Sequence, residues 1–238
     1  MTQTAGSSWK DAEVARKFLD VRRQIMPLGD EQVALMLRLA RRFVPQPIRV
    51  ADLGCGDGFM ARAILTEFPT ARALLIDHSE PMLQRTREAM APFADRYEAR
   101  HGDLSNPLPP QLGDGPFDLV VSGYAIHHLP SARKRSLYAE VLGLLVPGGL
   151  FVNVEHVASA TPELGAIFDD TYIDHLAAVT GRDRAEVAAE YHGRTDKADN
   201  ILDPVEVQVD WLREIGFGQA DCYFKWLELA VFGGVRSA

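Results

Sequence analysis

Apolar and polar positions along the chain follow different periods in different segments. Residues 10–26 and 31–43 carry apolar side chains at steps of three and four, which predicts two helices. From residue 48 onward, short apolar runs alternate with helical patterns. The expected strands are 48–53, 72–77, 97–101, 117–122 and 150–155, with helices at 58–67, 80–90 and 131–145. This alternation is typical of an α/β protein with a parallel sheet and helices on both faces.

The alternation ends after residue 156. Residues 157–202 contain helical patterns at 163–179 and 183–191 but no strand pattern, so we expect a helical insertion. A helix at 204–215 and apolar runs at 219–224 and 227–232 predict a helix and a β-hairpin. We therefore expect an N-terminal helical cap (1–47), an α/β core (48–156), an insertion that covers the substrate (157–202), and a C-terminal helix and hairpin that complete the sheet (203–238).

A glycine-rich segment, VADLGCGDG at residues 50–58, connects the first expected strand to the helix that follows it. Glycine tolerates a positive φ and lets a ligand approach the backbone closely. A helix N-terminus also offers unpaired N–H groups to anionic ligands. The dinucleotide motif G-x-G-x-x-G would need a third glycine at position 59, where this chain has Phe59. The loop therefore favours a different ligand class.

Five segments resemble, in the same order, the motifs of the class I S-adenosylmethionine (AdoMet)-dependent methyltransferase family. They are VADLGCGDG (50–58), LLIDHSEPML (74–83), GDL (102–104), FDLVVSGYAIHHL (117–129) and LVPGGLFVNVEH (145–156). The resemblance implies a Rossmann-like fold with a mostly parallel seven-stranded sheet, an antiparallel last strand, a helical cap, and AdoMet across the strand ends. Residues 22–27, 205–207 and 216–217 also resemble the carboxy-AdoMet synthase and tRNA uridine-oxyacetate branch, from which the insertion departs.

Three aspartates lie at or directly after the ends of consecutive expected strands, where an open parallel sheet binds its ligand. Asp77 is placed to accept hydrogen bonds from both ribose hydroxyls, although it could instead cap the next helix. Asp103 is placed to contact the adenine amino group, with the Leu104 N–H on a ring nitrogen, unless this segment is an exposed turn. Asp52 is expected to order the glycine loop or to meet the AdoMet ammonium group.

The complete cofactor site expected from these motifs is one continuous surface at the strand ends. Its residues are Asp52, Gly54, Cys55, Gly56, Gly58, Asp77, His78, Met82, Gly102, Asp103, Leu104, Ser122 and Gly123. We interpret Cys55 as a small residue that fills the loop, because a nucleophilic cysteine would need an activating base and none is evident.

Candidate catalytic residues follow the fourth and fifth strands. Methyl transfer depends mainly on holding the acceptor in line, and a base is needed only when the acceptor carries a proton of high pKa. We expect Tyr124, His127 and His156 to serve catalysis, with either histidine as base, and we assign His128 to loop packing. A soft nucleophile would need no base.

Candidate substrate-binding residues come from the N-terminal cap, the insertion and the hairpin. They are Arg22, Tyr172, His175, Lys225 and Trp226. No pair of cysteines or histidines recurs at the spacing of a zinc site, so we expect no metal.

Composition narrows the functional classes. A formal net charge of −8 argues against a nucleic-acid surface, although residues 1–49 hold nine Lys and Arg against five Asp and Glu. Those basic residues either line solvated helix faces or form a lid helix that faces an anionic ligand. Two cysteines fit a reducing cytoplasm, and no apolar run is as long as a membrane span.

The leading hypothesis is a cytoplasmic AdoMet-dependent methyltransferase that acts on a small-molecule acceptor. One alternative is a carboxy-AdoMet synthase-like enzyme that modifies AdoMet itself, with Arg22, Arg23 or Arg194 as partners of the new carboxylate. The others are a tRNA-modifying methyltransferase and a non-catalytic AdoMet-binding protein. The oligomeric state stays open, with a homodimer as one option.

Overall fold

The computed structural model describes residues 26–46 and 49–237. The helix predicted for residues 10–26 lies outside this range apart from its last residue, and Arg22 and Arg23 lie outside it as well.

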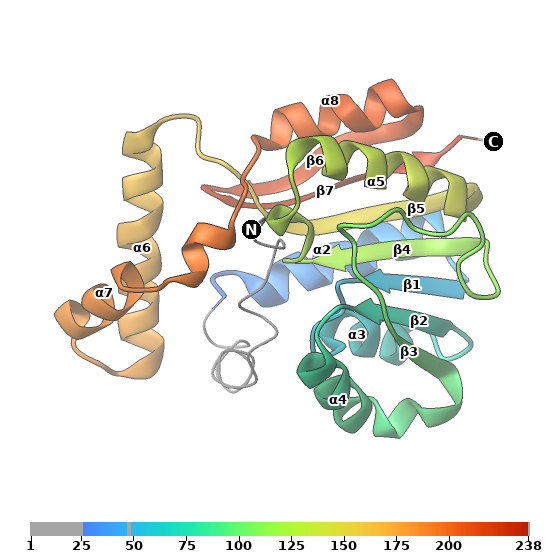
Figure 1. Ribbon diagram of the computed structural model, residues 1–238, viewed down its shortest axis with the longest axis horizontal. Coiled ribbons are helices and arrows are strands. Elements are labelled where there is room, and N and C mark those ends of the chain that lie inside the picture. The colour runs from blue at the N-terminus through green and yellow to red at the C-terminus, as the bar shows by residue number, and fades with distance from the viewer. Residues whose placement is uncertain (1–25, 47–48, 238) are drawn as a thin grey trace.

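Seven strands form a single sheet in the order β3-β2-β1-β4-β5-β7-β6 (Figure 1). The strands are β1 (Arg49–Leu53), β2 (Arg72–Asp77), β3 (Tyr97–His101), β4 (Phe117–Gly123), β5 (Leu145–His156), β6 (Phe217–Trp226) and β7 (Leu229–Arg236). Strands β1 to β5 pair in parallel, whereas β7 runs antiparallel to both β5 and β6. The mostly parallel seven-stranded sheet with an antiparallel last strand is thus confirmed.

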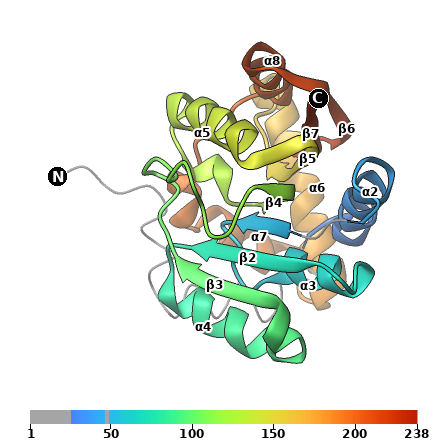
Figure 2. The same cartoon turned by 90° about the vertical axis from the view of Figure 1, so that its right-hand side faces the viewer.

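Helices cover both faces of this sheet (Figure 2). The α-helices are α2 (Gly29–Phe43), α3 (Phe59–Glu67), α4 (Glu80–Ala89), α5 (Ser131–Leu144), α6 (Pro162–Thr180), α7 (Arg184–His192) and α8 (Val205–Ile215), and the short 3-10 helices are η2 (Ala91–Arg96), η3 (Ile126–His128) and η4 (Asp196–Asp199). Helices α5 and α8 bury apolar side chains against one face, and α2, α3 and α4 do so against the other. Because both faces are covered, the inner strands are mostly apolar.

Aromatic packing anchors the face under α5. The Tyr138 ring lies 5.6 Å from that of Phe151 on β5 and 6.3 Å from that of Phe232 on β7, between ring centroids. The Tyr138 hydroxyl is buried, and it donates to Gln208 Oε1 of α8 at 2.6 Å. One residue therefore joins α5, α8 and the two strands at the parallel-to-antiparallel junction.

Strand β5 begins earlier than its sequence predicts. Pro147, Gly148 and Gly149 led us to expect a strand start at residue 150, but β5 begins at Leu145. The register with β4 shifts between the Phe117 and Leu119 pairs, so the extra residues form an irregularity that a proline can occupy. The expected boundary was wrong because these residues bend the strand without ending it.

Residues 157–202 stand to one side of the sheet, at the left of Figure 1. Both helices predicted there are present, as α6 and α7. They have a small core of their own, in which Phe168, Tyr172 and Tyr191 pack with Leu229 of the hairpin. The two ends of the insertion meet where the Ala158 N–H donates to the Asp203 carbonyl at 3.1 Å.

Two glycines in different surroundings, one between strands and one on an exposed helix face, test the close packing of the sheet. A Cβ at Gly233 would lie 2.0 Å from the Phe151 carbonyl oxygen, so G233A must separate β5 from β7. We expect it to lower the free energy of unfolding by about 3 kcal/mol or more. A Cβ at Gly143 of α5 meets nothing within 4 Å, so G143A should stabilise the protein by about 0.5 kcal/mol or more. Urea unfolding measures both, and equal effects would contradict the register of β5 and β7.

Candidate active site

The glycine loop has the backbone conformation that its composition predicts. Gly54, Gly56 and Gly58 have φ values of 72°, 57° and 75°, in the region that favours glycine. A Cβ at Gly54 would lie 2.2 Å from the Cβ of Ala125, in the loop after β4. The absence of a side chain therefore lets the loop after β1 pass directly beside the loop after β4.

Asp77 connects this loop to the end of β2. Its buried carboxylate accepts from the Gly56 N–H at 2.9 Å through Oδ2 and from the Ser79 N–H at 2.8 Å through Oδ1. The N-cap of α4 is Ser79, which accepts from the Met82 N–H at 3.4 Å. The capping role considered for Asp77 thus belongs to Ser79, and the ribose contact of Asp77 stays a prediction.

The other two aspartates order neighbouring turns. Asp52 is fully buried and accepts from the Ala61 N–H in the first turn of α3 at 3.2 Å. Asp103 is partly exposed and accepts from the Ser105 N–H at 2.9 Å, which stabilises a local turn. The Gly102 N–H donates to the Asp77 carbonyl at 3.0 Å, so Asp103 follows β3 directly beside the end of β2.

Several of the remaining predicted cofactor residues are buried or closely packed in this region. Met82 and Leu104 are buried. Ser122 is buried and donates its hydroxyl to the Leu53 carbonyl at 2.7 Å, which joins β4 to β1. A Cβ at Gly123 would lie 2.7 Å from the Cε at the flexible end of Met60, so Gly123 packs closely against this side chain.

Two side chains beside the loop differ in chemistry. Burial raises the pKa of the Cys55 thiol well above its usual value, and the nearby Asp52 and Asp77 raise it further. A thiol in this environment is a poor nucleophile, in agreement with its interpretation as a filler. The His78 ring is partly exposed, and its Nδ1 lies 3.7 Å from Asp77 Oδ1.

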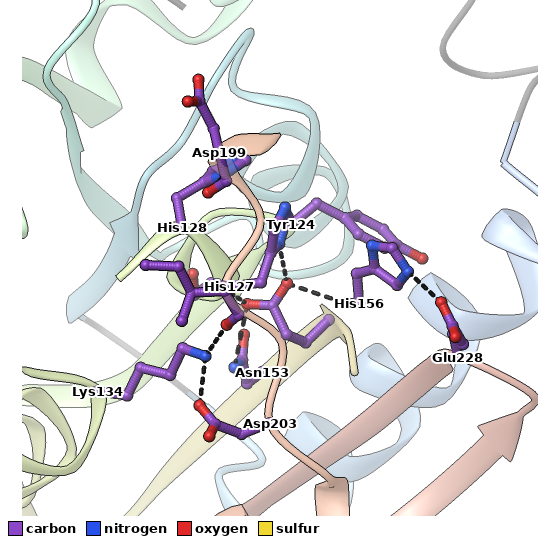
Figure 3. A network of polar contacts seen from close by, with 12 residues as sticks. Tyr124, His127, His128, Lys134, Asn153, His156, Asp199, Asp203 and Glu228 are labelled. Atoms are coloured by element: carbon purple, nitrogen blue, oxygen red, sulfur yellow. Dashed lines mark hydrogen bonds and ion pairs between the residues drawn. The ribbon is translucent and has the colours of Figure 1, made fainter. Parts of the chain in front are cut away.

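A second polar cluster lies after β4 and β5 (Figure 3). Glu155 is buried, and its Oε1 lies 2.5 Å from His127 Nδ1. The same carboxylate accepts from the His127 N–H at 3.1 Å and from the His156 N–H at 2.9 Å. The network requires a proton on Nδ1, so Nε2 is the ring nitrogen at which a proton can be gained or lost.

The charge state of this cluster follows from its contacts. Burial alone would raise the pKa of Glu155, but the charge and hydrogen bonds of His127 and the His156 N–H lower it below its usual value. The carboxylate is therefore ionised at neutral pH. Burial and the neighbouring His127 lower the pKa of His128 to about 3, so that ring is neutral.

His128 and His156 have partners of their own. His128 Nδ1 lies 3.1 Å from the Asp199 carbonyl, which fits the packing role expected from the sequence. His156 Nε2 lies 2.8 Å from Glu228 Oε2 at the hairpin. The His127 ring centroid is 4.0 Å from that of His128 and 5.7 Å from that of His156. Three imidazoles thus meet, and only His127 contacts the buried Glu155 carboxylate through its ring.

These imidazoles line a cavity of about 90 Å³ between the strand ends and the insertion. Its lining is rich in aromatic rings and basic groups: Met26, Tyr124, His127, His128, His156, Phe168, Tyr172, Tyr191, Arg194, Lys197, Asn200 and Leu229. Lys197 Nζ lies 3.6 Å from the centre of the Tyr191 ring and 3.3 Å from Asp169 Oδ1. The described lining contains no carboxylate.

Tyr124, a predicted catalytic residue, lies between the two halves of the site. Its φ of 54° is unusual for a residue other than glycine and is typical of functional positions. Its hydroxyl donates to Gln32 Oε1 of α2 at 2.6 Å, so the ring lines the cavity while the hydroxyl faces the helix.

The predicted substrate residues separate into two groups. Tyr172 lines the cavity. His175, Lys225 and Trp226 lie outside its lining: Lys225 is exposed and bonds to Glu206 at 3.1 Å, and Trp226 packs against Phe168.

Part of the cavity wall comes from residues that the sequence did not indicate. Phe168, Lys197 and Asn200 were not expected to bind substrate. Arg194 was named as one of three arginines that a carboxylated product would require. The role of Glu155 does have a sequence signal, because Asn153 and Glu155 alternate with valines and hence share one face of β5.

The described residues hold no group of three or more His, Cys, Asp or Glu side chains arranged for a metal ion. Within 26–46 and 49–237, no helix has the length and apolar character needed to cross a bilayer.

Residues 50–149 match the family described as "Methyltransferase domain". This match, the curated relatives and the fold support a class I AdoMet-dependent methyltransferase family. The chain is an enzyme, and solved structures of the same fold contain SAM or SAH.

Two curated relatives are similar to this chain over almost its whole length. The carboxy-S-adenosyl-L-methionine synthase of a Nitratiruptor species is 27% identical over 229 residues, covering 95% of this chain and 92% of that protein. The same enzyme of Shewanella amazonensis is 27% identical over 233 residues, covering 95% of this chain and 91% of that one.

Solved structures show the same fold. An O-methyltransferase family protein from Burkholderia thailandensis matches with a TM-score of 0.71 at 17% identity, over 99% of this chain and 63% of that one. Human N-acetylserotonin methyltransferase in complex with SAM matches with a TM-score of 0.63 at 13% identity, over 97% of this chain and 58% of that one. This chain thus spans about three fifths of those proteins.

The first site prediction concerns the cofactor. D77A removes the acceptor of the Gly56 and Ser79 N–H groups as well as the carboxylate expected at the ribose. We expect AdoMet affinity to fall at least about tenfold by calorimetry, since charge-assisted hydrogen bonds contribute about 1.5 kcal/mol or more each. D210A, on the exposed face of α8, is the control. Unchanged affinity in D77A would refute the cofactor site.

The second site prediction concerns the pH dependence of folding stability. Burial lowers the pKa of His128 to about 3, so between pH 6.5 and 3 the unfolded chain binds a proton that the folded chain does not. Stability is therefore lost as the pH falls through this window, by about 2 kcal/mol between pH 7 and pH 5. H128N should remove most of this loss in urea unfolding, whereas H101N, at an exposed histidine, should not. Parallel wild-type and H128N curves would contradict a neutral, buried His128.

Proposed function

We propose that the protein transfers the methyl group of AdoMet to a hydroxyl group of an aromatic small molecule, with His127 as the general base. The observation that carries this proposal is the buried His127–Glu155 pair at the wall of an aromatic cavity. A hydroxyl acceptor keeps its proton at neutral pH, so its methylation benefits from a positioned base.

Glu155 prepares His127 for this role in two ways. Its contact with Nδ1 at 2.5 Å selects the tautomer in which Nε2 is free to take a proton. Its negative charge then stabilises the imidazolium that forms, as the buried aspartate does in serine hydrolases. The N–H groups of His127 and His156 hold the carboxylate in place, so the pair is organised before substrate arrives.

The cavity supports an aromatic acceptor that carries a negative charge. Phe168, Tyr172 and Tyr191 offer ring faces and edges against which a flat ring can pack. Arg194 and Lys197 add two basic groups to a lining that has no described carboxylate. Because Lys197 is paired with Asp169 at 3.3 Å, Arg194 is the group that we expect to meet a negative charge on the acceptor.

AdoMet is expected to occupy the strand ends beside this cavity, held by the glycine loop, Asp77 and Asp103. AdoMet supplies an electrophilic methyl group on its sulfonium. The positive φ values of Gly54, Gly56 and Gly58 fit such a ligand, because they keep side chains out of the crevice. The protein contributes orientation of the acceptor, exclusion of water and removal of the acceptor proton.

A second candidate function is synthesis of carboxy-AdoMet. The relatives from Nitratiruptor and Shewanella bear that name, and Arg194 and Lys197 could pair with a carboxylate. The His127–Glu155 base favours methyl transfer to a hydroxyl. The cytoplasmic location, the exclusion of nucleic acid and the homodimer remain predictions.

The test first identifies the reaction products and then compares variants. The wild-type enzyme is incubated with AdoMet and a panel of phenols, catechols and hydroxybenzoates, and with a metabolite extract. Mass spectrometry should detect a methyl ether and S-adenosylhomocysteine. A carboxylated AdoMet would support the second candidate instead.

Two variants then identify the base. H127N and E155Q should lower kcat by about 100-fold or more, because a general base contributes about 10²–10⁴ in rate. AdoMet affinity should stay within twofold, because neither residue belongs to the expected cofactor site. E228Q disturbs the other His–Glu pair, at His156, and should cost far less. A larger loss in E228Q than in E155Q would assign the base to His156.

A further inference from the structure

Lys134 is a buried lysine that the proposed chemistry does not use. It lies in α5 with 1% of its side chain exposed. Its Nζ lies 2.6 Å from Asp203 Oδ2 and also donates to the Ile201 carbonyl. Burial of a charge is costly unless it is paired and hydrogen-bonded, and the partners of Lys134 satisfy that condition.

Both partners belong to one stretch, residues 199–203, which we call the return segment because it leads from the insertion back to α8. Asp203 also accepts from the Ser131 hydroxyl at 2.8 Å, and its carbonyl accepts from the Ala158 N–H and from Gln208 Nε2. Lys134 therefore holds a segment that closes the insertion.

The return segment contacts the candidate base directly. The Ile201 N–H donates to the His127 carbonyl at 2.8 Å, and the Asp199 carbonyl lies 3.1 Å from His128 Nδ1. Figure 3 shows Lys134 and Asp203 below these contacts and Asp199 above them. Residues 199, 201 and 203 thus bond in succession to His128, His127 and the start of α5.

The same segment continues the cavity wall. Arg194 and Lys197 precede it, and Asn200 belongs to it, and all three line the cavity. A displacement of residues 199–203 would therefore move the base loop and the acceptor wall together.

We infer that Lys134 is a positioning residue: through Asp203 and Ile201 it clamps the return segment to η3, and so holds the base His127 and the cavity wall in register. This inference rests on the proposed function of His127. Lys134 is not among the residues that line the cavity, nor does it belong to the expected cofactor site, and it acts through the backbone of Ile201.

The decisive experiment separates positioning from stability. K134M leaves Asp203 without its cation and should destabilise the fold, because removal of one partner strands a buried charge. K134M/D203N removes both charges and should recover much of the melting temperature. In the double variant we expect kcat to fall about tenfold and the acceptor KM to rise, with AdoMet affinity within twofold of wild type. K134R keeps the charge and should restore kcat to within about threefold.

A neighbouring ion pair is the control. Arg135 follows Lys134 in α5 and bonds to Glu214 at 2.8 Å, but both side chains are more than half exposed. R135M should leave all of these quantities within twofold. A double variant with wild-type kcat and acceptor KM would overturn the inference, as would equal losses of AdoMet affinity and turnover.

Hydrogen exchange tests the clamp without turnover. The Ile201 amide, bonded to the His127 carbonyl, should lose protection in K134M/D203N and keep it in R135M. Unchanged protection refutes the clamp whatever the reaction is. If wild type methylates no hydroxyl acceptor but exchange rises as expected, the proposed function fails and the clamp stands.

Discussion

The ionised Glu155 carboxylate is the group on which the arrangement of the active site depends. It is buried at the end of β5, where a charge is tolerated only with full hydrogen bonding. Its oxygens accept from the ring and backbone of His127 and from the His156 N–H, and Asn153 Nδ2 lies 3.5 Å away. The loop after β4 must therefore fold against the end of β5. The need to satisfy one carboxylate fixes where the base lies.

The site has two halves with different physical characters. At the ends of β1 to β3, backbone conformation and carboxylates dominate, with glycines at positive φ and Asp77 bonded to the loop. Beyond β4 and β5, aromatic rings and basic groups dominate, and many of them come from the insertion. Tyr124 borders both halves, with its ring at the cavity and its hydroxyl bonded to α2. The expected cofactor site and the proposed acceptor site thus lie on separate segments.

Periodicity predicted most of the fold, because buried parallel strands are apolar runs and helices repeat every three to four residues. Strand ends likewise predicted Asp52, Asp77 and Asp103 as neighbours. The start of β5 escaped prediction, since proline and glycine mark bulges as well as strand ends. Lys197 escaped because its place depends on how the insertion folds back. Lys134 stands between Arg133 and Arg135, where the sequence resembles a solvated helix face.

The insertion leaves and rejoins the α/β core at one point, where the Ala158 N–H meets the Asp203 carbonyl at 3.1 Å. The two ends of the insertion are held together, so a change in its length should alter the stability of the core little, because loop-closure entropy grows only slowly with length. Acceptor preference can therefore diversify by replacement of residues 159–198, while the return segment and the expected cofactor half stay unaltered. The fold thus separates most of the wall of the proposed acceptor cavity from the expected cofactor site.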